Sequence, residues 1–309
     1  MVSGEIGRGH PRIEPARSAL VSGATDGIGR ATACALANLG WRVILLARDP
    51  GRGAATADEI ARETGNPRVE SVPCDLSRMA SVRAAAAEIA RRAPSLDVLV
   101  NNAAATFSDF GLTEDGIERT AATNHVGPFL LTGLLLESLR AAPAGRVVNV
   151  ASNGHRRTDL DLAAFTRDDA YFVLRAYDRS KLANVLFTVE LAERLRGGSV
   201  TANCLHPGRI ATRIGEKDGM RGPHRLAWRA ISRITGHGPE AGARPVIHLA
   251  VADEVAGVTG RYFTGFSALA NRPLVHIREE RMHACVADAG LRRRLWALSE
   301  ELSGARFPA

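Results

Sequence analysis

The sequence predicts an α/β fold, a doubly wound parallel sheet of seven strands with helices on both faces, formed by a single domain at residues 18–309. Short apolar runs alternate with longer stretches in which apolar residues recur at helical spacing, and this alternation is typical of a parallel sheet with crossover helices. A glycine-rich turn joins the first strand to the first helix. The chain of 309 residues is 45% hydrophobic, which is enough for one large core.

Each predicted strand is a short apolar run bounded by polar residues or glycine. The strands cover residues 18–23, 41–47, 69–74, 96–100, 146–151, 199–205 and 258–264. Helical spacing covers residues 30–39, 51–64, 114–142, 176–196, 240–252 and 278–302, and a further helix begins near Met79. The sequence shows no internal repeat and no second domain.

Composition indicates the compartment. Residues 1–17 are polar and rich in glycine, arginine and proline, so we expect a disordered tail and no signal peptide. The longest apolar stretch, residues 127–136, is too short to cross a bilayer. The cysteines lack metal-site spacing and indicate reduced thiols; they are Cys34, Cys74, Cys204 and Cys285. We therefore expect a cytoplasmic protein without membrane anchor or metal, and the sequence leaves homo-oligomerisation open.

The formal net charge is +7, and the arginines that produce it are scattered along the chain. A scattered positive surface favours anionic ligands, such as a phosphorylated cofactor, without forming the continuous patch of a nucleic-acid interface. We therefore expect no nucleic-acid partner. Of the 40 Lys and Arg residues, only Lys181 and Lys217 are lysines.

A candidate catalytic group lies between residues 146 and 181. Ser152 follows a predicted strand, and ligands of such sheets bind at the carboxyl ends of strands. Tyr177 and Lys181 are four residues apart and share one face of the next helix. A nearby cation lowers the pKa of a tyrosine, which can then exchange a proton with a carbonyl or alcohol oxygen that Ser152 holds. The alternative is an ordinary helix pair, but in this arginine-rich chain a lysine at position 181 is a specific choice.

A second candidate site is the turn between the first strand and the first helix. Glycines there let the backbone approach a pyrophosphate, and the helix N-terminus presents N–H groups to it. The residues that form this turn are Gly23, Ala24, Thr25, Asp26, Gly27, Ile28 and Gly29. The spacing Gly-x-x-x-Gly-x-Gly differs from the dinucleotide fingerprint, and the alternative is a glycine turn without a ligand.

The end of the second strand bears on the choice of cofactor. Enzymes that use the unphosphorylated nicotinamide cofactor usually have an acid there, which binds the ribose hydroxyls. This chain has Ala47 followed by Arg48, and an arginine can bind a 2′-phosphate in bidentate fashion. We expect NADP(H) rather than NAD(H). Asp49 either opposes this interpretation or caps the next helix.

These motifs together resemble the short-chain dehydrogenase/reductase family over residues 18–265. The resemblance adds Asn101-Asn102-Ala103-Ala104, an Asn-His-Val-Gly-Pro-Phe stretch at 124–129, Val150-Ala151-Ser152 and Pro207-Gly208. Within the family the chain looks most like the retinol dehydrogenase and protochlorophyllide reductase branch. The pieces that resemble this branch are Ala47-Arg48-Asp49, the long gap from Ser152 to Tyr177, Ser180-Lys181-Leu182-Ala183-Asn184 and Arg293-Arg294-Leu295-Trp296. Ala104 stands where the family motif has glycine.

The resemblance implies a Rossmann-type fold and a set of site residues. The implied catalytic tetrad is Asn124, Ser152, Tyr177 and Lys181. The implied cofactor contacts are Gly23, Thr25, Asp26, Gly27, Ile28, Gly29, Arg48, Asp75, Leu76, Asn102, Ala103, Tyr177, Lys181, Pro207, Gly208, Ile210 and Thr212. Asp75 has the alternative role of capping the helix near Met79.

The function that follows is hydride transfer between NADPH and a carbonyl or alcohol. One alternative keeps the fold but performs epimerisation, dehydration or double-bond reduction, and another is a non-catalytic NADP-sensing protein. A substrate lid at about 209–239 and a wall at 153–176 favour a bulky, mostly apolar substrate; the residues that suggest this are Phe165, Phe172, Met220 and Trp228. The arginine-rich, lysine-poor composition is typical of GC-rich bacteria, in which such reductases often tailor secondary metabolites.

The last prediction concerns Asn124, four residues before Pro128. Proline has no N–H, so if 114–142 is one helix it is kinked, and the Asn124 carbonyl has no helical partner. In the family the matching asparagine holds a water that links the catalytic lysine to solvent. We expect such a water between Asn124 O and Lys181 Nζ. The alternative is a helix that ends before Pro128.

Overall fold

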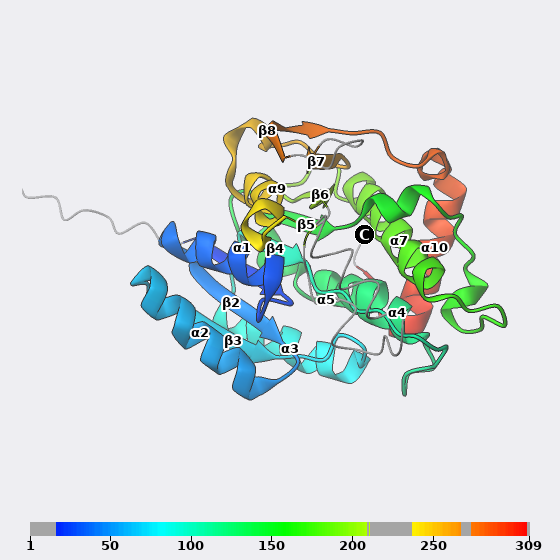
Figure 1. Ribbon diagram of the computed structural model, residues 1–309, viewed down its shortest axis with the longest axis horizontal. Coiled ribbons are helices and arrows are strands. Elements are labelled where there is room, and N and C mark those ends of the chain that lie inside the picture. The colour runs from blue at the N-terminus through cyan, green and yellow to red at the C-terminus, as the bar shows by residue number, and fades with distance from the viewer. Residues whose placement is uncertain (1–16, 209, 211–236, 267–272, 308–309) are drawn as a thin grey trace, which may run out of the picture.

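The structure is a computed structural model that describes residues 17–208, 210, 237–266 and 273–307. Within these residues eight strands form one sheet in the order β3-β2-β1-β4-β5-β6-β7-β8, and neighbours from β3 to β7 are parallel (Figure 1). The strands are β1 (Ser18–Ser22), β2 (Arg42–Ala47), β3 (Val69–Pro73), β4 (Val98–Asn101), β5 (Arg146–Val150), β6 (Thr201–His206), β7 (Tyr262–Phe266) and β8 (Pro273–Glu279). The predicted doubly wound α/β class is confirmed.

Helices cover both faces of the sheet (Figure 1). One core lies beneath α1 (Gly27–Asn38), α2 (Pro50–Thr64) and α9 (Pro239–Val251). The other lies beneath α3 (Met79–Arg92), α5 (Gly127–Leu134) and α7 (Val173–Arg194), against which α10 (Ala289–Ser303) packs. Strands buried on both faces are apolar throughout, which is why they are recognisable as short continuous runs.

The eighth strand was not predicted. We expected a terminal helix from residue 278, but β8 pairs antiparallel with β7 and α10 begins only at Ala289, capped by Asp288. The charged residues at the end of β8 fit the helical pattern of the next segment, so the strand was not recognised from the sequence. Pro273 opens β8, a position that suits an edge strand because proline cannot donate to a ladder.

The predicted helix at 114–142 is a series of shorter turns. It comprises α4 (Arg119–Ala121), the π-helical turn η1 (Ala122–Val126), α5, and α6 (Leu136–Arg140). Helical structure runs without a break from α4 through η1 into α5, and the residues at both junctions have α-helical dihedrals, so Pro128 lies within a helical run and directly after a π-turn. Gly127 is required here because a Cβ would lie 2.2 Å from the Leu76 carbonyl oxygen. The proline is thus accommodated by a π-turn in the middle of the helix and does not end it.

Candidate active site

The predicted site residues converge at the carboxyl ends of β1, β4, β5 and β6, which are neighbours in the sheet. The strand order reverses between β1 and β4, and in such sheets this is where a ligand-binding crevice forms. Asn102 follows β4, Ser152 follows β5 and Pro207 follows β6. Residues far apart in the sequence are therefore brought together by topology alone.

The glycine turn has the backbone of a phosphate cradle. Gly23 and Gly27 have φ of 65° and 55°, which other residues rarely adopt. A Cβ on Gly29 would lie 2.4 Å from the Gly23 carbonyl oxygen, so only glycine fits there. Asp26 Oδ1 accepts a hydrogen bond from Gly27 N at 2.8 Å and caps α1. The residues present therefore fit a cofactor pyrophosphate at the N-terminus of α1.

Asn102 and Ala103 support this turn from β4. Asn102 Nδ2 donates to the Ser22 carbonyl at 2.8 Å, and Ser22 Oγ accepts from the backbone N–H groups of Asn102 and Ala103 at 2.9 and 3.0 Å. A Cβ on Gly23 would lie 2.9 Å from Ala103 Cα. The side chain of Asn102 thus holds the cradle itself, a role that the sequence does not reveal.

The segment after β2 carries two arginines and one acid. Ala47 is buried, and Arg48 is exposed directly after it. Asp49 Oδ1 accepts from Arg52 N at 2.9 Å and caps α2, which resolves the ambiguity about Asp49 in favour of the cap. Arg52 Nη2 lies 3.4 Å from both Thr25 O and Asp26 Oδ2, so its guanidinium lies beside the glycine turn. Arg52 was not predicted as a site residue, although it lies four residues after Arg48.

Asp75 does not cap α3, so that alternative is wrong. Its Oδ1 accepts from the backbone N–H and hydroxyl of Ser77 at 2.9 and 2.7 Å, while Asp115 Oδ2 accepts from Met79 N at 3.0 Å. The N-cap residue of α3 is Arg78, whose side chain makes no capping bond. Leu76 is buried. Asp75 therefore lies in a local turn directly after β3.

Helix α7 begins at Val173 and carries Tyr177 and Lys181, and Lys181 contacts the end of β5. Lys181 is 2% exposed, and its Nζ donates to the Val150 carbonyl at 2.9 Å. The same Nζ lies 5.6 Å from the centre of the Tyr177 ring. Ser152 Oγ accepts from Gly154 N at 3.1 Å. The hydroxyl, the phenol and the ammonium thus meet in one place.

Burial governs the ionisation of both groups on α7. It raises the pKa of Tyr177 to about 12, although a hydrogen bond with Ser152 opposes the shift. Burial also lowers the pKa of Lys181 to about 8. The expected lowering of the Tyr177 pKa is therefore wrong for this structure, because the loss of hydration of the phenolate is the largest effect.

An ion pair unforeseen in the sequence lies next to Tyr177. The Arg157 guanidinium donates to both carboxylate oxygens of Asp178 at 3.0 and 2.8 Å. Asp178 raises the pKa of Tyr177, and Arg157 lowers it. A Cβ on Gly154 would lie 2.0 Å from Asp178 Oδ1, so the turn after Ser152 packs directly against this pair.

Asn124 lies in η1 and is fully buried. Its Oδ1 accepts from Ala105 N at 2.7 Å, and its Nδ2 donates to Ala105 O and Ser180 Oγ, both at 3.0 Å. Its backbone carbonyl accepts from Asn184 Nδ2 at 2.9 Å. The side chain therefore joins the loop after β4 to α7. The expected water between Asn124 O and Lys181 stays a prediction.

The segment after β6 is described only in part. Gly208 has φ of 86°, and Ile210 forms a bridge with His237 and packs near Ile28 on α1. Thr212, Met220, Trp228 and most of the predicted lid at 209–239 lie outside the described residues, as does the tail up to residue 16.

Two aromatic residues predicted to line the substrate wall behave differently. Phe165 is 2% exposed and packs against the ring of His125, so it belongs to the core and not to a pocket. The sequence could not distinguish these faces because the 153–176 segment has no regular period. Phe172 is 50% exposed, directly before α7.

Comparison with known proteins decides the family. The sequence profile of the short chain dehydrogenase family matches residues 17–220. The chain belongs to this family. Retinol dehydrogenase 13 of Homo sapiens is 38% identical over 298 residues, 96% of this chain and 87% of that protein. Polyprenol dehydrogenase of Mus musculus is also 38% identical over 298 residues, 94% of this chain and 85% of that protein. The chain lies in the retinol dehydrogenase-like branch, as predicted.

Solved structures of the family share the fold. An uncharacterized protein from Mycobacterium Paratuberculosis has a TM-score of 0.74 at 31% identity and covers 95% of each chain. The active-site complex of RhlG with NADP, from Pseudomonas aeruginosa, has a TM-score of 0.64 at 28% identity and covers 82% of this chain and 97% of that one. The chain is therefore an oxidoreductase of the short-chain dehydrogenase family that acts with a nicotinamide cofactor.

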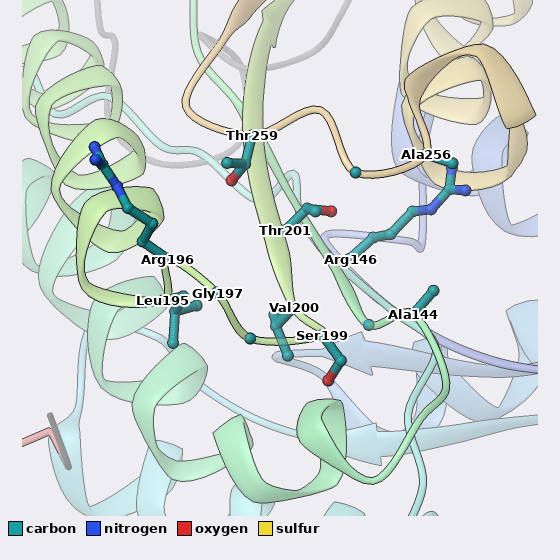
Figure 2. A pocket seen from close by; sticks show the side chains of 13 residues that line it. Ala144, Arg146, Leu195, Arg196, Gly197, Ser199, Val200, Thr201, Ala256 and Thr259 are labelled. Atoms are coloured by element: carbon teal, nitrogen blue, oxygen red, sulfur yellow. The ribbon is translucent and has the colours of Figure 1, made fainter.

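A separate hollow of about 330 Å³ lies at the opposite ends of the strands (Figure 2). Arg146 and Thr201, the first residues of β5 and β6, line it together with the turn from Leu195 to Val200. It contains none of the predicted site residues. Within the described part of the chain, no cluster of His, Cys, Asp and Glu could hold a metal ion, and no helix is long and apolar enough to span a membrane.

Proposed function

We propose that this protein is an NADPH-dependent oxidoreductase that transfers hydride between the cofactor and a bulky, mostly apolar carbonyl or alcohol. The observation that supports this most directly is the meeting of Ser152, Tyr177 and Lys181 beside the glycine cradle. When bound, the cofactor supplies or accepts the hydride. The chain itself must hold the substrate oxygen and move its proton.

In the reduction direction Tyr177 is the proton donor. Because its pKa is about 12, the phenol is protonated at neutral pH. Its hydroxyl gives a proton to the carbonyl oxygen as negative charge develops there, and Ser152 donates a hydrogen bond to the same oxygen. Lys181 places positive charge beside the ring and stabilises the phenolate that remains. The reverse direction requires the phenolate and is expected to be faster at high pH.

A preference for NADP(H) is supported by the charges after β2. Arg48 directly follows Ala47, Asp49 is engaged in capping α2, and the Arg52 guanidinium lies beside the glycine turn. A 2′-phosphate there would meet two guanidinium groups, which bind phosphate through charged hydrogen bonds. The relative RhlG was solved as a complex with NADP.

A bulky apolar substrate is supported by the relatives and by exposed apolar side chains near the start of α7. Two relatives are named for retinol and polyprenol, which are both isoprenoid alcohols. In this chain large apolar side chains are exposed around the start of α7 and in the loop after β4; they are Phe110, Leu112, Phe172 and Leu174. Phe110 contacts Tyr171 edge to face at 6.0 Å, so the two segments are adjacent.

We also propose that the enzyme works in the cytoplasm and takes part in the tailoring of secondary metabolites.

The test is NADPH consumption by the purified protein with a panel of carbonyls. We expect oxidation of NADPH with polycyclic and long-chain ketones or aldehydes, and less with small polar carbonyls. Better activity on the small polar carbonyls would contradict the substrate assignment. Substrate change without net loss of NADPH would indicate an epimerase or dehydratase, and cofactor binding without turnover of any compound would indicate a sensing protein.

A further inference from the structure

A chain of buried polar side chains connects Asn124 to the C-terminal helix. Asn184 Nδ2 donates to the Asn124 carbonyl at 2.9 Å, and Asn184 Oδ1 lies 3.1 Å from His125 Nδ1. His125 Nε2 lies 2.9 Å from Ser299 Oγ on α10. None of the four residues is more than 7% exposed. The chain therefore runs through the interior from the predicted tetrad to α10.

The donor and the acceptor of each hydrogen bond in this chain can be assigned by starting from the Asn124 carbonyl. The Asn124 carbonyl can only accept, so the Asn184 amide nitrogen faces it and the amide oxygen faces His125. His125 Nδ1 must then carry a proton. Burial lowers the pKa of His125 to about 4, so its Nε2 is unprotonated and accepts from Ser299. The Leu295 carbonyl, 2.7 Å from Ser299 Oγ, competes for that single hydrogen.

Pro128 explains why the Asn124 carbonyl needs a donor from another helix. In an α-helix this carbonyl would accept from the N–H of residue 128, and proline has none. Buried carbonyls are almost always hydrogen-bonded. Asn184 meets this need from α7, one helical turn after Lys181.

We propose that Asn184 is a positioning residue for the reaction. It replaces the missing N–H of Pro128, fixes the direction of the Asn124 carbonyl from a position one turn after Lys181 on α7, and is itself oriented by His125 and Ser299. The geometry of the tetrad thus depends on the docking of α10. The kinetic part of this inference rests on the proposed function, while the replacement of the N–H does not.

The first experiment requires no activity. It compares the thermal unfolding midpoint of the parent, Asn184→Ala, Pro128→Ala and the double variant. Pro128→Ala restores a backbone N–H four residues after Asn124, so we expect the loss caused by Asn184→Ala to be smaller in the Pro128→Ala background. Equal losses in both backgrounds would overturn the idea that Asn184 replaces this donor.

The second experiment measures carbonyl reduction. Asn184→Ala should lower kcat by about ten- to a hundredfold, as expected for a displaced catalytic group, and leave the KM for NADPH within about twofold. The matched control is Thr188→Val, one turn further along α7. Thr188 Oγ1 donates to the Asn184 backbone carbonyl and accepts from Asn149, so its loss destabilises the same helix without touching the Asn184 side chain. It should lower the unfolding midpoint and leave kcat unchanged.

Asn184→Asp gives a readout that a purely structural role would not change. A protonated carboxyl can still donate to the Asn124 carbonyl, and an ionised one cannot. We therefore expect kcat of this variant to fall as pH rises through the pKa of the new carboxyl, and the loss in Asn184→Ala to be present at every pH. An unchanged kcat in Asn184→Ala, in an active parent, would overturn the positioning role. If the parent protein oxidises no NADPH, that result counts against the proposed function instead. The unfolding comparison would still show whether Asn184 replaces the missing N–H of residue 128.

Discussion

Burial shifts Tyr177 and Lys181 away from ionisation, and this single cause sets the chemistry of both residues. A phenol with a raised pKa stays protonated at neutral pH, which suits a proton donor. An amine whose pKa is about 8 is still mostly protonated at neutral pH, so Lys181 keeps its charge but gives up a proton more readily than a free lysine. Neither property is visible in the sequence, because the four-residue spacing shows only that the two side chains share a face.

The shift of Lys181 predicts a pH-dependent stability. Its pKa falls from 10.5 to about 8 on folding, so between these values the unfolded chain binds a proton that the folded chain does not. The contribution of Lys181 to the free energy of unfolding should therefore rise with pH across this window, by up to about 3 kcal/mol in total, and be lost as pH falls through 8. Urea unfolding of the parent and of Lys181→Met at pH 7.5 to 10.5 (about one pH unit apart) measures the difference. A constant difference across the series would contradict the shift.

Two single residues, Arg48 and Arg52, predict the preference for NADPH over NADH. Arg48→Ala should weaken NADPH binding by about ten- to a hundredfold and barely affect NADH, because a charged hydrogen bond contributes about 1.5–3 kcal/mol. Arg52→Ala should act in the same direction but less strongly, since Arg52 also contacts Thr25 and Asp26. Arg62→Ala, at the far end of α2, removes one charge and is the control. Equal losses for both cofactors in a fluorescence titration would rule out the phosphate contact.

At the scale of elements, the π-turn η1 and the helix α5 fit against the loop after β3 through one glycine. A Cβ on Gly127 would lie 2.2 Å from the Leu76 backbone oxygen, whereas a Cβ on Gly51 in α2 would meet only Asp49 Oδ1 at 3.5 Å. Gly127→Ala should therefore lower the free energy of unfolding by about 1–3 kcal/mol through overpacking. Gly51→Ala should be neutral or stabilising, by up to about 1 kcal/mol, because alanine favours helix. Similar effects of the two substitutions on denaturant unfolding would show that the fit at Gly127 is loose.

The sequence predicted regular elements better than their interruptions. The parallel strands from β1 to β7 were found because each contains a short run rich in apolar and β-branched residues, bounded by polar residues or glycine. The 114–142 segment was predicted as a helix kinked near Pro128, and the structure has a continuous helical run over 119–134 with a π-turn directly before Pro128. The π-turn was not predicted, because its position depends on packing as well as on the proline. β8 was missed because an edge strand with charged residues lacks the apolar signal of the others.

In the whole molecule, the site residues that could be predicted from the sequence are those whose motifs directly follow a strand. Ser152 and Asn102 follow adjacent strands, and a doubly wound sheet necessarily brings such residues to one edge. The support around them was not predictable. Asn184, His125 and Ser299 come from three separate helical segments, and only the packing of α10 against α7 brings them together. The pairing of Arg157 with Asp178 depends on tertiary structure in the same way.

The central claim is that Tyr177 transfers the proton while the rest of the site binds NADPH. The measurement that tests it most directly compares the parent with Tyr177→Phe in two assays, single-turnover reduction of an accepted carbonyl and fluorescence titration with NADPH. The account predicts a loss of about 10²–10⁴-fold in the rate of reduction, the usual contribution of general acid catalysis, with NADPH affinity unchanged within about twofold. A phenylalanine variant that reduces the carbonyl as fast as the parent would contradict the account.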